Sequence, residues 1–277
     1  MNHPTGVSSE LYEVYSVYLD RVIVLKGMLY HVVNIFKDKS ESIVSRENNL
    51  PNFLSASSLV IGDLTGPDED GWKLYYHTGK NYIVQSKLYE SEIRNYEVRE
   101  ANYSVIQAYE SFSTFLKDIV ASYLFLNKDF HSIKHVEYNS SLIDYKESMR
   151  KYNSGRNNKD LFKLIRELSG SFRNGENNNG AGMDIYEWYQ ALSVIRHALV
   201  HSEGVIKGKT IGEISSTQKG ILHGEFCDKT CSNGYINVNM TIDVADKTLE
   251  RIAELAYFVF KCLSIEIGKE WRVMKGQ

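Results

Sequence analysis

The chain has 277 residues, of which 43% are hydrophobic and 24% are charged, and its formal net charge is −3 at pH 7. This is the composition of an ordinary globular protein, long enough for one large domain or two small ones. The slightly negative net charge excludes a protein that binds nucleic acid or anionic membranes through its overall charge. Any phosphate-binding surface must therefore be local.

Cysteine content and the first residues favour a cytoplasmic protein. The three cysteines, Cys227, Cys231 and Cys262, are too few for a disulfide scaffold. Residues 1–10 lack the basic start and apolar core of a signal peptide. The longest uncharged stretches, such as residues 50–62, are too short and too polar to span a bilayer, so no membrane partner is expected.

The first third of the chain predicts one long helix and a β-hairpin. The helix covers about residues 9–38, where apolar side chains recur at helical spacing. These positions are Leu11, Val14, Tyr18, Val22, Leu25, Leu29, Val32 and Phe36. Residues 63–72 form a dense turn signal. Residues 72–85 contain two aromatic and β-branched arms around Thr78–Asn81, which is typical of a hairpin with its turn at those four residues.

From about residue 92 the pattern becomes helical. An apolar seam steps by three and four residues, which is typical of a helix with one buried face. The seam consists of Val105, Ala108, Phe112, Phe115 and Ile119. Weaker helical patterns follow at residues 140–152 and 157–169. The glycine- and asparagine-rich residues 169–182 are expected to form a mobile loop.

A further helix is expected to begin at Asp184. Asp184 can cap its N-terminus, and Glu187 can reach back to the cap. The predicted buried stripe consists of Ile185, Trp188, Leu192, Ile195 and Leu199. Residues 202–204, with the sequence SEG, are expected to end this helix.

The remaining chain predicts short strands and one long helix. Residues 205–214 and 234–244 are rich in β-branched residues and favour strands that flank residues 223–234. A last helix is expected at 245–268, with Leu249, Ile252, Ala256, Val259 and Leu263 facing inward. The predicted fold is therefore mainly α, a helical bundle with small β-hairpin insertions. We expect an N-terminal segment, residues 1–95, and a helical domain, residues 96–277.

Three nitrogen-rich side chains, Arg196, His197 and His201, gather near the end of the helix that Asp184 caps. On an ideal helix Arg196 and His201 point about 140° apart, so they do not share one face. They could meet if the helix ends near Val200 and lets His201 turn. Alternatively, Arg196 of one copy could approach His201 of a second copy. The negative end of the helix dipole would favour a positive charge on His201.

The segment RHALVH, residues 196–201, resembles the Arg–polar–three residues–His signature of the HEPN superfamily (higher eukaryotes and prokaryotes nucleotide-binding). Members are bundles of four or five helices, and the signature falls at the end of the helix before the last. Residues 108–120 are similar to the acidic and aromatic helix that often opens such bundles. The resemblance covers about residues 96–270. The chain departs from the minimal pattern in a linker at 127–182, in the β-rich insertion after the motif and in its unassigned first third.

The resemblance implies a metal-independent endoribonuclease that works as a homodimer, with two copies of the motif in one cleft. His201 would exchange a proton with the ribose 2′-OH or the leaving 5′-oxygen. Arg196 would hold the phosphate and stabilise charge in the transition state, and His197 would orient these two groups or contact RNA. The products would be a 2′,3′-cyclic phosphate and a 5′-hydroxyl. Such enzymes often serve as toxins or phage-defence effectors, with an antitoxin or a neighbouring defence protein as a partner.

Two further groups of residues are candidates for contacts to RNA. Lys207 and Lys209, with Lys219 beyond them, could form the local basic rim that RNA requires in an acidic protein. A solvated surface is the simpler interpretation of these lysines. Glu110, on the helix of the apolar seam, is expected to face the cleft by analogy with the polar residues on that helix of the family.

Three alternatives stay open. Arg196 and His201 could be ordinary helix-surface residues, one with its stem on the core and the other near free carbonyls. The chain could also be a catalytically inactive HEPN-like scaffold that binds a nucleotide or a protein. Finally, His197 and His201 lie one helical turn apart, and His223, Cys227 and Cys231 are spaced by four. This spacing permits a zinc-stabilised binding module, although structural zinc sites usually use closer cysteine pairs. For the proposed ribonuclease, no metal or cofactor is expected.

Overall fold

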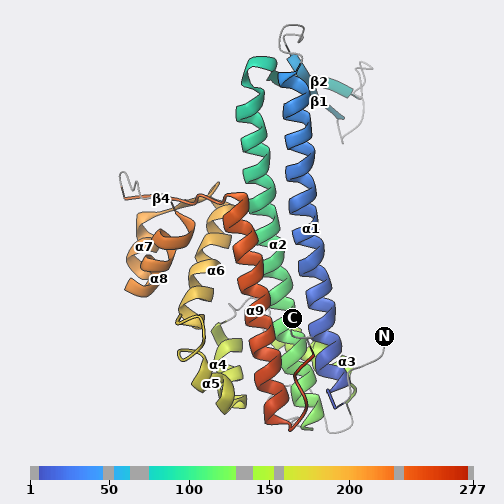
Figure 1. Ribbon diagram of the computed structural model, residues 1–277, viewed down its shortest axis with the longest axis vertical. Coiled ribbons are helices and arrows are strands. Elements are labelled where there is room, and N and C mark those ends of the chain that lie inside the picture. The colour runs from blue at the N-terminus through green and yellow to red at the C-terminus, as the bar shows by residue number, and fades with distance from the viewer. Residues whose placement is uncertain are drawn as a thin grey trace, which may run out of the picture. The chain divides into compact units, whose positions relative to one another are not determined.

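The structure is a computed structural model that describes residues 6–45, 53–62, 75–128, 140–152, 159–227 and 234–273. The described part of the chain is mainly helical, with two small two-stranded antiparallel sheets, which confirms the predicted fold class (Figure 1). None of the described helices has both the length and the apolar character needed to cross a membrane.

The chain divides into two compact units, Met1–Leu29 with Ala101–Gln277 and the intervening Tyr30–Glu100. This division differs from the predicted boundary at residue 95, because the start of the first helix belongs to the larger unit. The reason is aromatic packing. The buried Tyr15 ring stacks on the Phe260 ring with the two centroids 4.7 Å apart, which joins the two ends of the chain.

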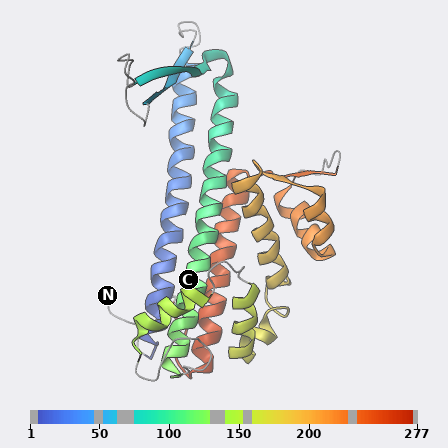
Figure 2. The ribbon, with the colours of Figure 1, turned by 180° about the vertical axis from the view of Figure 1, so that it is seen from behind.

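The larger unit is a helical bundle. Its long elements are the first part of α1 (Ser9–Val44), the second part of α2 (Tyr89–Leu126), α6 (Ile185–His201) and α9 (Ile242–Glu266). Its shorter helices are α3 (Leu142–Tyr152), α4 (Lys159–Leu168), α5 (Gly170–Gly175), α7 (Gly208–Glu213) and α8 (Ser216–Ile221), followed by the π-helical turn η3 (Leu222–Phe226). Figures 1 and 2 both show α9 beside α2, with α6 on the side of this pair away from α1.

Aromatic rings join α1, α2, α4 and α6 at the centre of the bundle. The Tyr18 ring meets Phe112 at 5.9 Å, and Phe112 meets Tyr189 at 5.3 Å, both measured between ring centroids. Tyr189 also stacks on Tyr109 at 5.2 Å and contacts Phe162 at 4.9 Å. Such pairs add about 0.5–1.5 kcal/mol each beyond the burial of their area. All five predicted seam residues of α2 and all five inward residues of α9 are buried, which confirms both predicted faces.

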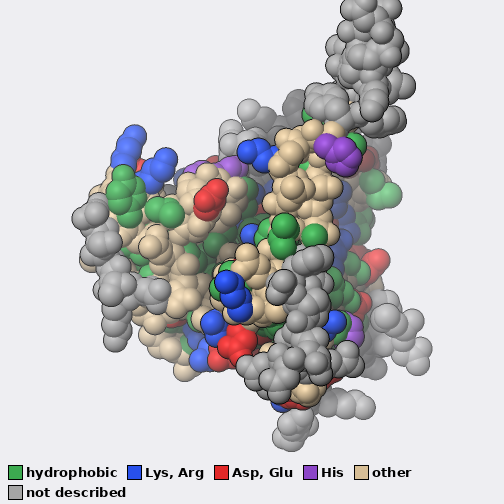
Figure 3. All heavy atoms as spheres, turned by 90° about the horizontal axis from the view of Figure 1, so that it is seen from above, with side chains coloured by type: hydrophobic (Ala, Val, Ile, Leu, Met, Phe, Trp, Pro, Cys, Tyr) green, Lys and Arg blue, Asp and Glu red, His purple; other side chains and the backbone are tan. Residues whose placement is uncertain are grey.

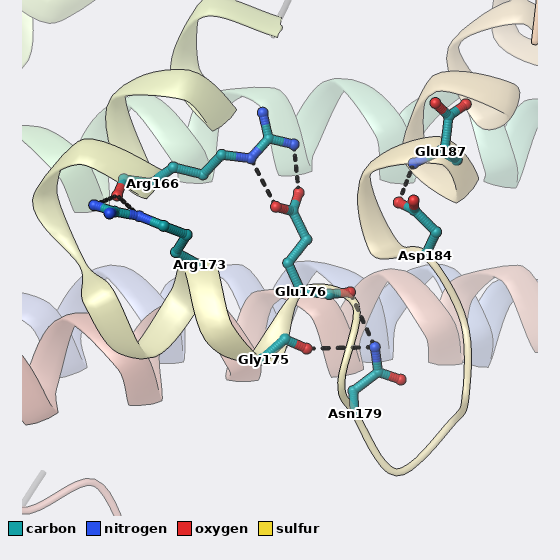
Figure 4. Close-up of polar contacts among 7 residues, drawn as sticks. All are labelled: Arg166, Arg173, Gly175, Glu176, Asn179, Asp184 and Glu187. Atoms are coloured by element: carbon teal, nitrogen blue, oxygen red, sulfur yellow. Dashed lines mark hydrogen bonds and ion pairs between the residues drawn. The ribbon is translucent and has the colours of Figure 1, made fainter.

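The expected mobile loop at residues 169–182 is partly a helix, so that prediction is wrong for its first half. Ser169 caps α5 by accepting a hydrogen bond from the backbone N–H of Phe172 at 3.0 Å. Phe172 is fully buried and packs against Phe258 with ring centroids 5.1 Å apart. The side-chain amide of Asn179 then donates to the carbonyls of Gly175 and Glu176 (Figure 4). It also donates to the carbonyl of Met183 and so closes the following turn. The polar residues hold the turn through their own hydrogen bonds, which composition does not reveal.

A partly buried ion pair holds α4 against the residues that follow α5. The Arg166 guanidinium donates to both carboxylate oxygens of Glu176, at 2.7 and 2.6 Å (Figure 4). Only 6% of the Glu176 side chain is exposed, compared with 31% for Arg166. Arg166 also lies 4.4 Å from the centroid of the Tyr186 ring, and its carbonyl accepts two hydrogen bonds from Arg173. Because α6 begins a few residues beyond Glu176, this pair anchors the segment that leads into α6.

Glu266, the last residue of α9, makes the α5–α9 contact dependent on pH. Its carboxylate accepts hydrogen bonds from the Ser171 backbone N–H at 3.0 Å and from the Ser169 hydroxyl at 2.9 Å. These bonds hold the pKa of Glu266 below its ordinary value of 4.5. A carboxylate with a lowered pKa in the folded state stabilises the fold above its unfolded pKa, and this stabilisation is lost as the pH falls through the folded pKa.

We therefore expect Glu266→Gln to destabilise the protein by about 1 kcal/mol or less at neutral pH, since the group is largely in solvent. The difference from wild type should shrink as the pH falls below the ordinary glutamate pKa of 4.5. Urea unfolding of both proteins at several pH values measures it. A difference that stays constant across the acid range would contradict this role of the carboxylate.

The smaller unit contains a two-stranded sheet, and its topology corrects the predicted hairpin. Residues 75–85 do not fold back on themselves: β2 (Tyr75–Gln85) is one strand, paired antiparallel with β1 (Phe53–Gly62). The sequence Thr78–Asn81 forms a bulge, not a turn. Ser58 pairs with Asn81 while Val60 pairs with His77, so β2 carries extra residues between these pairs. The predicted turn at residues 63–72 lies outside the described residues.

Gly79 explains why this bulge looks like a turn in the sequence. Its φ of +72° is in the left-handed region, where glycine has no steric penalty. The Thr78 hydroxyl donates to the carbonyl of Leu59 across the sheet at 2.9 Å and accepts from the Lys80 backbone N–H at 3.2 Å. A bulge and a tight turn use the same residue types, so the local sequence does not distinguish them.

The segment after α6 has much less β-structure than predicted. The described strands are only β3 (Val205–Ile206) and β4 (Ile236–Asn237), which pair antiparallel. Most of the predicted strand at 205–214 is α7, and α8 starts where the Ser215 hydroxyl accepts from the Gln218 backbone N–H at 3.1 Å. The end of the predicted strand at 234–244 instead starts α9, because the Thr241 hydroxyl caps that helix.

Candidate functional site

Helix α6 carries the Arg–His motif, and its start forms as predicted. The Asp184 carboxylate accepts a hydrogen bond from the Glu187 backbone N–H at 2.9 Å (Figure 4). The Glu187 carboxylate does not complete a capping box. It accepts instead from the Ser215 hydroxyl at 2.8 Å and so ties α6 to the start of α8. The predicted stripe faces the core, with Leu199 partly buried and the other four residues buried.

We expect Asp184→Ala to destabilise the protein by about 1 kcal/mol, because a backbone N–H at the start of α6 loses its acceptor. Asp184→Asn is the matched control, since asparagine caps helices about as well as aspartate. Chemical unfolding of the three proteins measures the effect. Equal loss of stability in both variants would show that the charge, and not the cap, matters at this position.

The end of α6 decides how the motif residues lie. His201 is the last helical residue, and the Ala198 carbonyl accepts from the backbone N–H of Ser202 at 2.9 Å and of Gly204 at 3.0 Å. Glu203 and Gly204 both have positive φ, of 51° and 81°, which turns the chain away as the SEG sequence predicted. α6 ends one residue beyond Val200 and includes His201, so His201 keeps the direction that an ideal helix gives it. Arg196 and His201 of one chain therefore point about 140° apart.

Arg196 lies beside Glu110, which α2 contributes. The Arg196 Nη2 and the Glu110 Oε1 form an ion pair. Arg196 is half-buried, and its Nε is buried with no hydrogen-bond partner among the described residues. Two of the predicted site residues are thus brought together from helices far apart in the sequence. The carboxylate offsets the charge of the guanidinium, so an anionic ligand of Arg196 would have to compete with Glu110.

His197 and His201 form an exposed pair on the last turn of α6. Their ring centroids are 4.8 Å apart, with the ring planes inclined at 48°. Both side chains are exposed, as their positions one turn apart on the solvent side predict. Two imidazoles at this separation can share a proton-transfer role or contact one anion, since each ring has a nitrogen that can donate.

The predicted basic rim follows directly after the motif. Lys207 and Lys209 are both exposed, and Lys207 precedes α7 without capping it through its side chain. Lys219, in α8, is half-buried. On the face drawn in Figure 3, the coloured lysine and arginine side chains appear in small separate groups.

The predicted zinc ligands are only partly described. His223 is half-buried in η3, and Cys227 forms a β-bridge with Val238, whereas Cys231 lies outside the described residues. Among the residues that the structure describes, no three His, Cys, Asp or Glu side chains are placed to hold a metal ion. Cys262 is buried in α9, and burial raises the pKa of its thiol to about 12, which leaves it protonated and unreactive.

One cavity was not predicted from the sequence. It has a volume of about 370 Å³ and lies between α6, η3 and α9, with Trp188, Glu225, Lys247 and Arg251 among its lining residues. The Trp188 indole N–H donates to the Glu225 carboxylate at 3.0 Å and holds η3 against α6. No local pattern could have revealed it, because three separate segments supply its walls.

No family model, curated protein or solved structure matches this chain. The geometry of α6 is therefore the basis for a functional assignment. The half-buried Arg196 pairs with Glu110. The exposed His197 and His201 follow Arg196 one and five residues further along the helix.

Proposed function

We propose that the chain is a metal-independent endoribonuclease of the HEPN type. The observation that carries the proposal is the position of the motif: Arg196 and His201 lie in the last two turns of α6, the long helix that precedes α9 in a helical bundle. The exposed imidazole of His201 and the half-buried guanidinium of Arg196 would supply an acid–base group and a cation for phosphodiester cleavage without a metal.

The chemistry needs one proton acceptor, one proton donor and a cation. In the proposed reaction the ribose 2′-oxygen loses its proton and attacks phosphorus, while the bond from phosphorus to the 5′-oxygen breaks and that oxygen gains a proton. His201 would accept or supply one of these protons, and a water molecule would exchange the other. Arg196 would stabilise the extra negative charge on the phosphorane, and His197 would contact the same phosphate. The products carry a 2′,3′-cyclic phosphate and a 5′-hydroxyl.

The proposal places the reacting groups on two chains. Arg196 and His201 diverge by about 140° on one regular helix, so a cleft between two α6 helices brings them together more readily than one helix does. The exposed Lys207 and Lys209, directly after the motif, would contact phosphates beside the cleft. A homodimer with RNA as its substrate is thus the simplest assembly, and a role as a toxin or phage-defence effector is consistent with it.

The test is cleavage of total RNA and transfer RNA in excess EDTA, with analysis of the new ends. We expect wild type to produce 2′,3′-cyclic phosphate ends and Arg196→Ala to lose at least about 100-fold in rate, because a transition-state donor is removed. Because Arg196→Ala also removes the ion pair with Glu110 and the packing of a half-buried stem, rates are compared at a temperature at which both proteins are folded. RNA that stays intact, or equal cleavage by the variant, would refute the proposal.

A second candidate is a catalytically inactive HEPN-like scaffold, and the Arg196–Glu110 ion pair favours it. A guanidinium that is already paired with a carboxylate has less need of a phosphate. This scaffold would bind RNA or a nucleotide without cleaving it, and Glu110→Gln would strengthen that binding. Binding without new RNA ends would support this second assignment.

A further inference from the structure

Two adjoining cavities beside α9 differ in the side chains that line them. The cavity of about 370 Å³ next to η3 is lined by charged side chains, which are Glu225, Lys247, Glu250, Arg251 and Glu254. A second cavity, of about 400 Å³, lies toward the turn that Asn179 closes (Figure 4) and has an apolar lining of Met183, Ile185, Leu255 and Phe258. Trp188, Arg251 and Glu254 line both cavities. Each volume is within the range of about 300–1,000 Å³ that is usual for small-molecule sites.

Two of the three carboxylates in the charged cavity already have an ionic partner. The Glu250 carboxylate lies 2.7 Å from the Lys26 ammonium of α1. The Glu254 carboxylate lies 3.3 Å from Nε of Arg251, one turn earlier in α9. These two charges are therefore offset within the protein and place little demand on a ligand.

Two charges of opposite sign in the same cavity have no ionic partner among the described residues. The Glu225 carboxylate accepts a hydrogen bond from the Trp188 indole N–H at 3.0 Å, which orients the carboxylate but does not cancel its charge. Lys247 is exposed, and its ammonium forms no ion pair or hydrogen bond with a described residue. Glu225 and Lys247 also do not pair with each other. A ligand with one ammonium and one carboxylate would complement both.

Arg251 adds a second cation where the two cavities meet. Its Nη1 donates to the Met183 sulfur, and a thioether is a weak acceptor. A carboxylate could replace this contact at little cost, because a charge-assisted hydrogen bond is stronger. Arg251 thus lies where the charged part of a ligand would join an apolar part.

We propose that this site binds a free α-amino acid with an apolar side chain. Its carboxylate contacts Lys247 and Arg251, its ammonium contacts Glu225, and its side chain occupies the apolar cavity beside Leu255 and Phe258. The exposed Lys247 lies at the open side of the site, so the amino acid enters from solvent. No lining residue belongs to the Arg–His motif of α6, so the proposal does not rest on the ribonuclease.

Isothermal titration of the full chain with L-leucine and L-phenylalanine tests the proposal. At least one of them should bind. Two analogues of each amino acid then separate its charges: isocaproate and hydrocinnamate lack the ammonium, and isoamylamine and phenethylamine lack the carboxylate. Each analogue should bind at least about tenfold more weakly than its amino acid, since a hydrogen bond between charged groups is lost. Glycine, which lacks an apolar side chain, should also bind at least about tenfold more weakly.

Two variants assign the charges. Glu225→Gln keeps an acceptor for the Trp188 N–H but removes the negative charge. It should weaken binding of the amino acid at least about threefold without weakening that of the analogue that lacks the ammonium. Lys247→Gln should weaken the amino acid by a similar factor without weakening the analogue that lacks the carboxylate. A variant that fails to fold would lose all ligands alike, so this selectivity separates a lost contact from a lost fold.

Glu213→Gln is the matched control, because Glu213 is an exposed carboxylate of α7 that lines neither cavity. It should bind the amino acid as wild type does. The proposal is overturned if neither amino acid binds at millimolar concentration, or if the analogue without the ammonium or without the carboxylate binds as tightly as its amino acid. Folded Glu225→Gln and Lys247→Gln proteins that bind every ligand as wild type does would also overturn it.

Discussion

Replacing His201 with alanine should lower the rate of RNA cleavage by about 10²–10⁴-fold, the range that a positioned acid or base supplies. The fold should not change, because the side chain is exposed at the last turn of α6, beside the His197 ring. Initial rates on a labelled RNA, with EDTA present, measure the effect. The rate should fall without a comparable change in KM, since the lost group acts on the reacting atoms.

His77→Ala is the matched control for this loss. His77 is an exposed histidine on β2, in the smaller unit, with no proposed part in the reaction. Its variant should cleave RNA at the wild-type rate. His197→Ala should fall between the two, because His197 lies beside His201 and is proposed to contact the phosphate only. Full activity in His201→Ala would remove the acid–base role and leave the scaffold as the better assignment.

Glu176→Ala should cause the largest loss of stability of the changes considered, about 2–4 kcal/mol. The variant leaves the Arg166 guanidinium partly buried beside Tyr186 with no carboxylate to accept its two hydrogen bonds. Removing one partner of such a pair costs more than the pair itself contributes, because the remaining charge is poorly solvated. The estimate is below the usual value for a fully buried pair, since 31% of Arg166 is exposed. Urea unfolding at neutral pH measures it.

A double replacement distinguishes an unpaired charge from lost packing. Arg166→Met with Glu176→Leu removes both charges and keeps the volume, so it should recover most of the stability that Glu176→Ala loses. Arg150→Ala, which breaks a bidentate but exposed pair with Asp118, should cost about 1 kcal/mol or less. If the double variant is as unstable as Glu176→Ala, packing of the two stems is the dominant contribution.

The long helices could be predicted from the sequence because each buries one face, and the apolar residues of that face recur at helical spacing. The seam of α2 from Val105 to Ile119 and the inner face of α9 from Leu249 to Leu263 are buried at every predicted position. The Asp184 cap was also predictable, since the cap and its N–H donor are three residues apart. These features depend on interactions within one helix or on one apolar face.

Prediction from the sequence was wrong where contact with a distant segment determines the local structure. Thr78 and Gly79 make a bulge because Leu59 of another strand accepts the threonine hydroxyl. Phe172 makes the glycine-rich segment fold because Phe258, in α9, provides a surface to pack against. Neither partner lies among the few neighbouring residues from which a turn or a loop is predicted.

The candidate site has features that a local sequence pattern indicates and features that only the packing of distant segments determines. The Arg–polar–three residues–His pattern at the end of a helix selects Arg196, His197 and His201 as candidates, and family analogy alone adds Glu110. Its ion pair with Arg196 depends on the packing of α6 against α2, which the Tyr109–Tyr189 stack fixes one position before Glu110. No sequence pattern predicted the hydrogen bond from Trp188 to Glu225, because its two residues come from a helix and from a separate π-helical turn.

The regular course of α6 through His201 has a kinetic consequence for the proposed enzyme. If the arginine and the histidine of one active site come from different chains, the rate below the association threshold should rise with the square of the protein concentration. Dilution would then switch the activity off without any inhibitor. Two inactive variants, Arg196→Ala and His201→Ala, would restore activity when mixed, because a mixed pair retains one site with both groups intact.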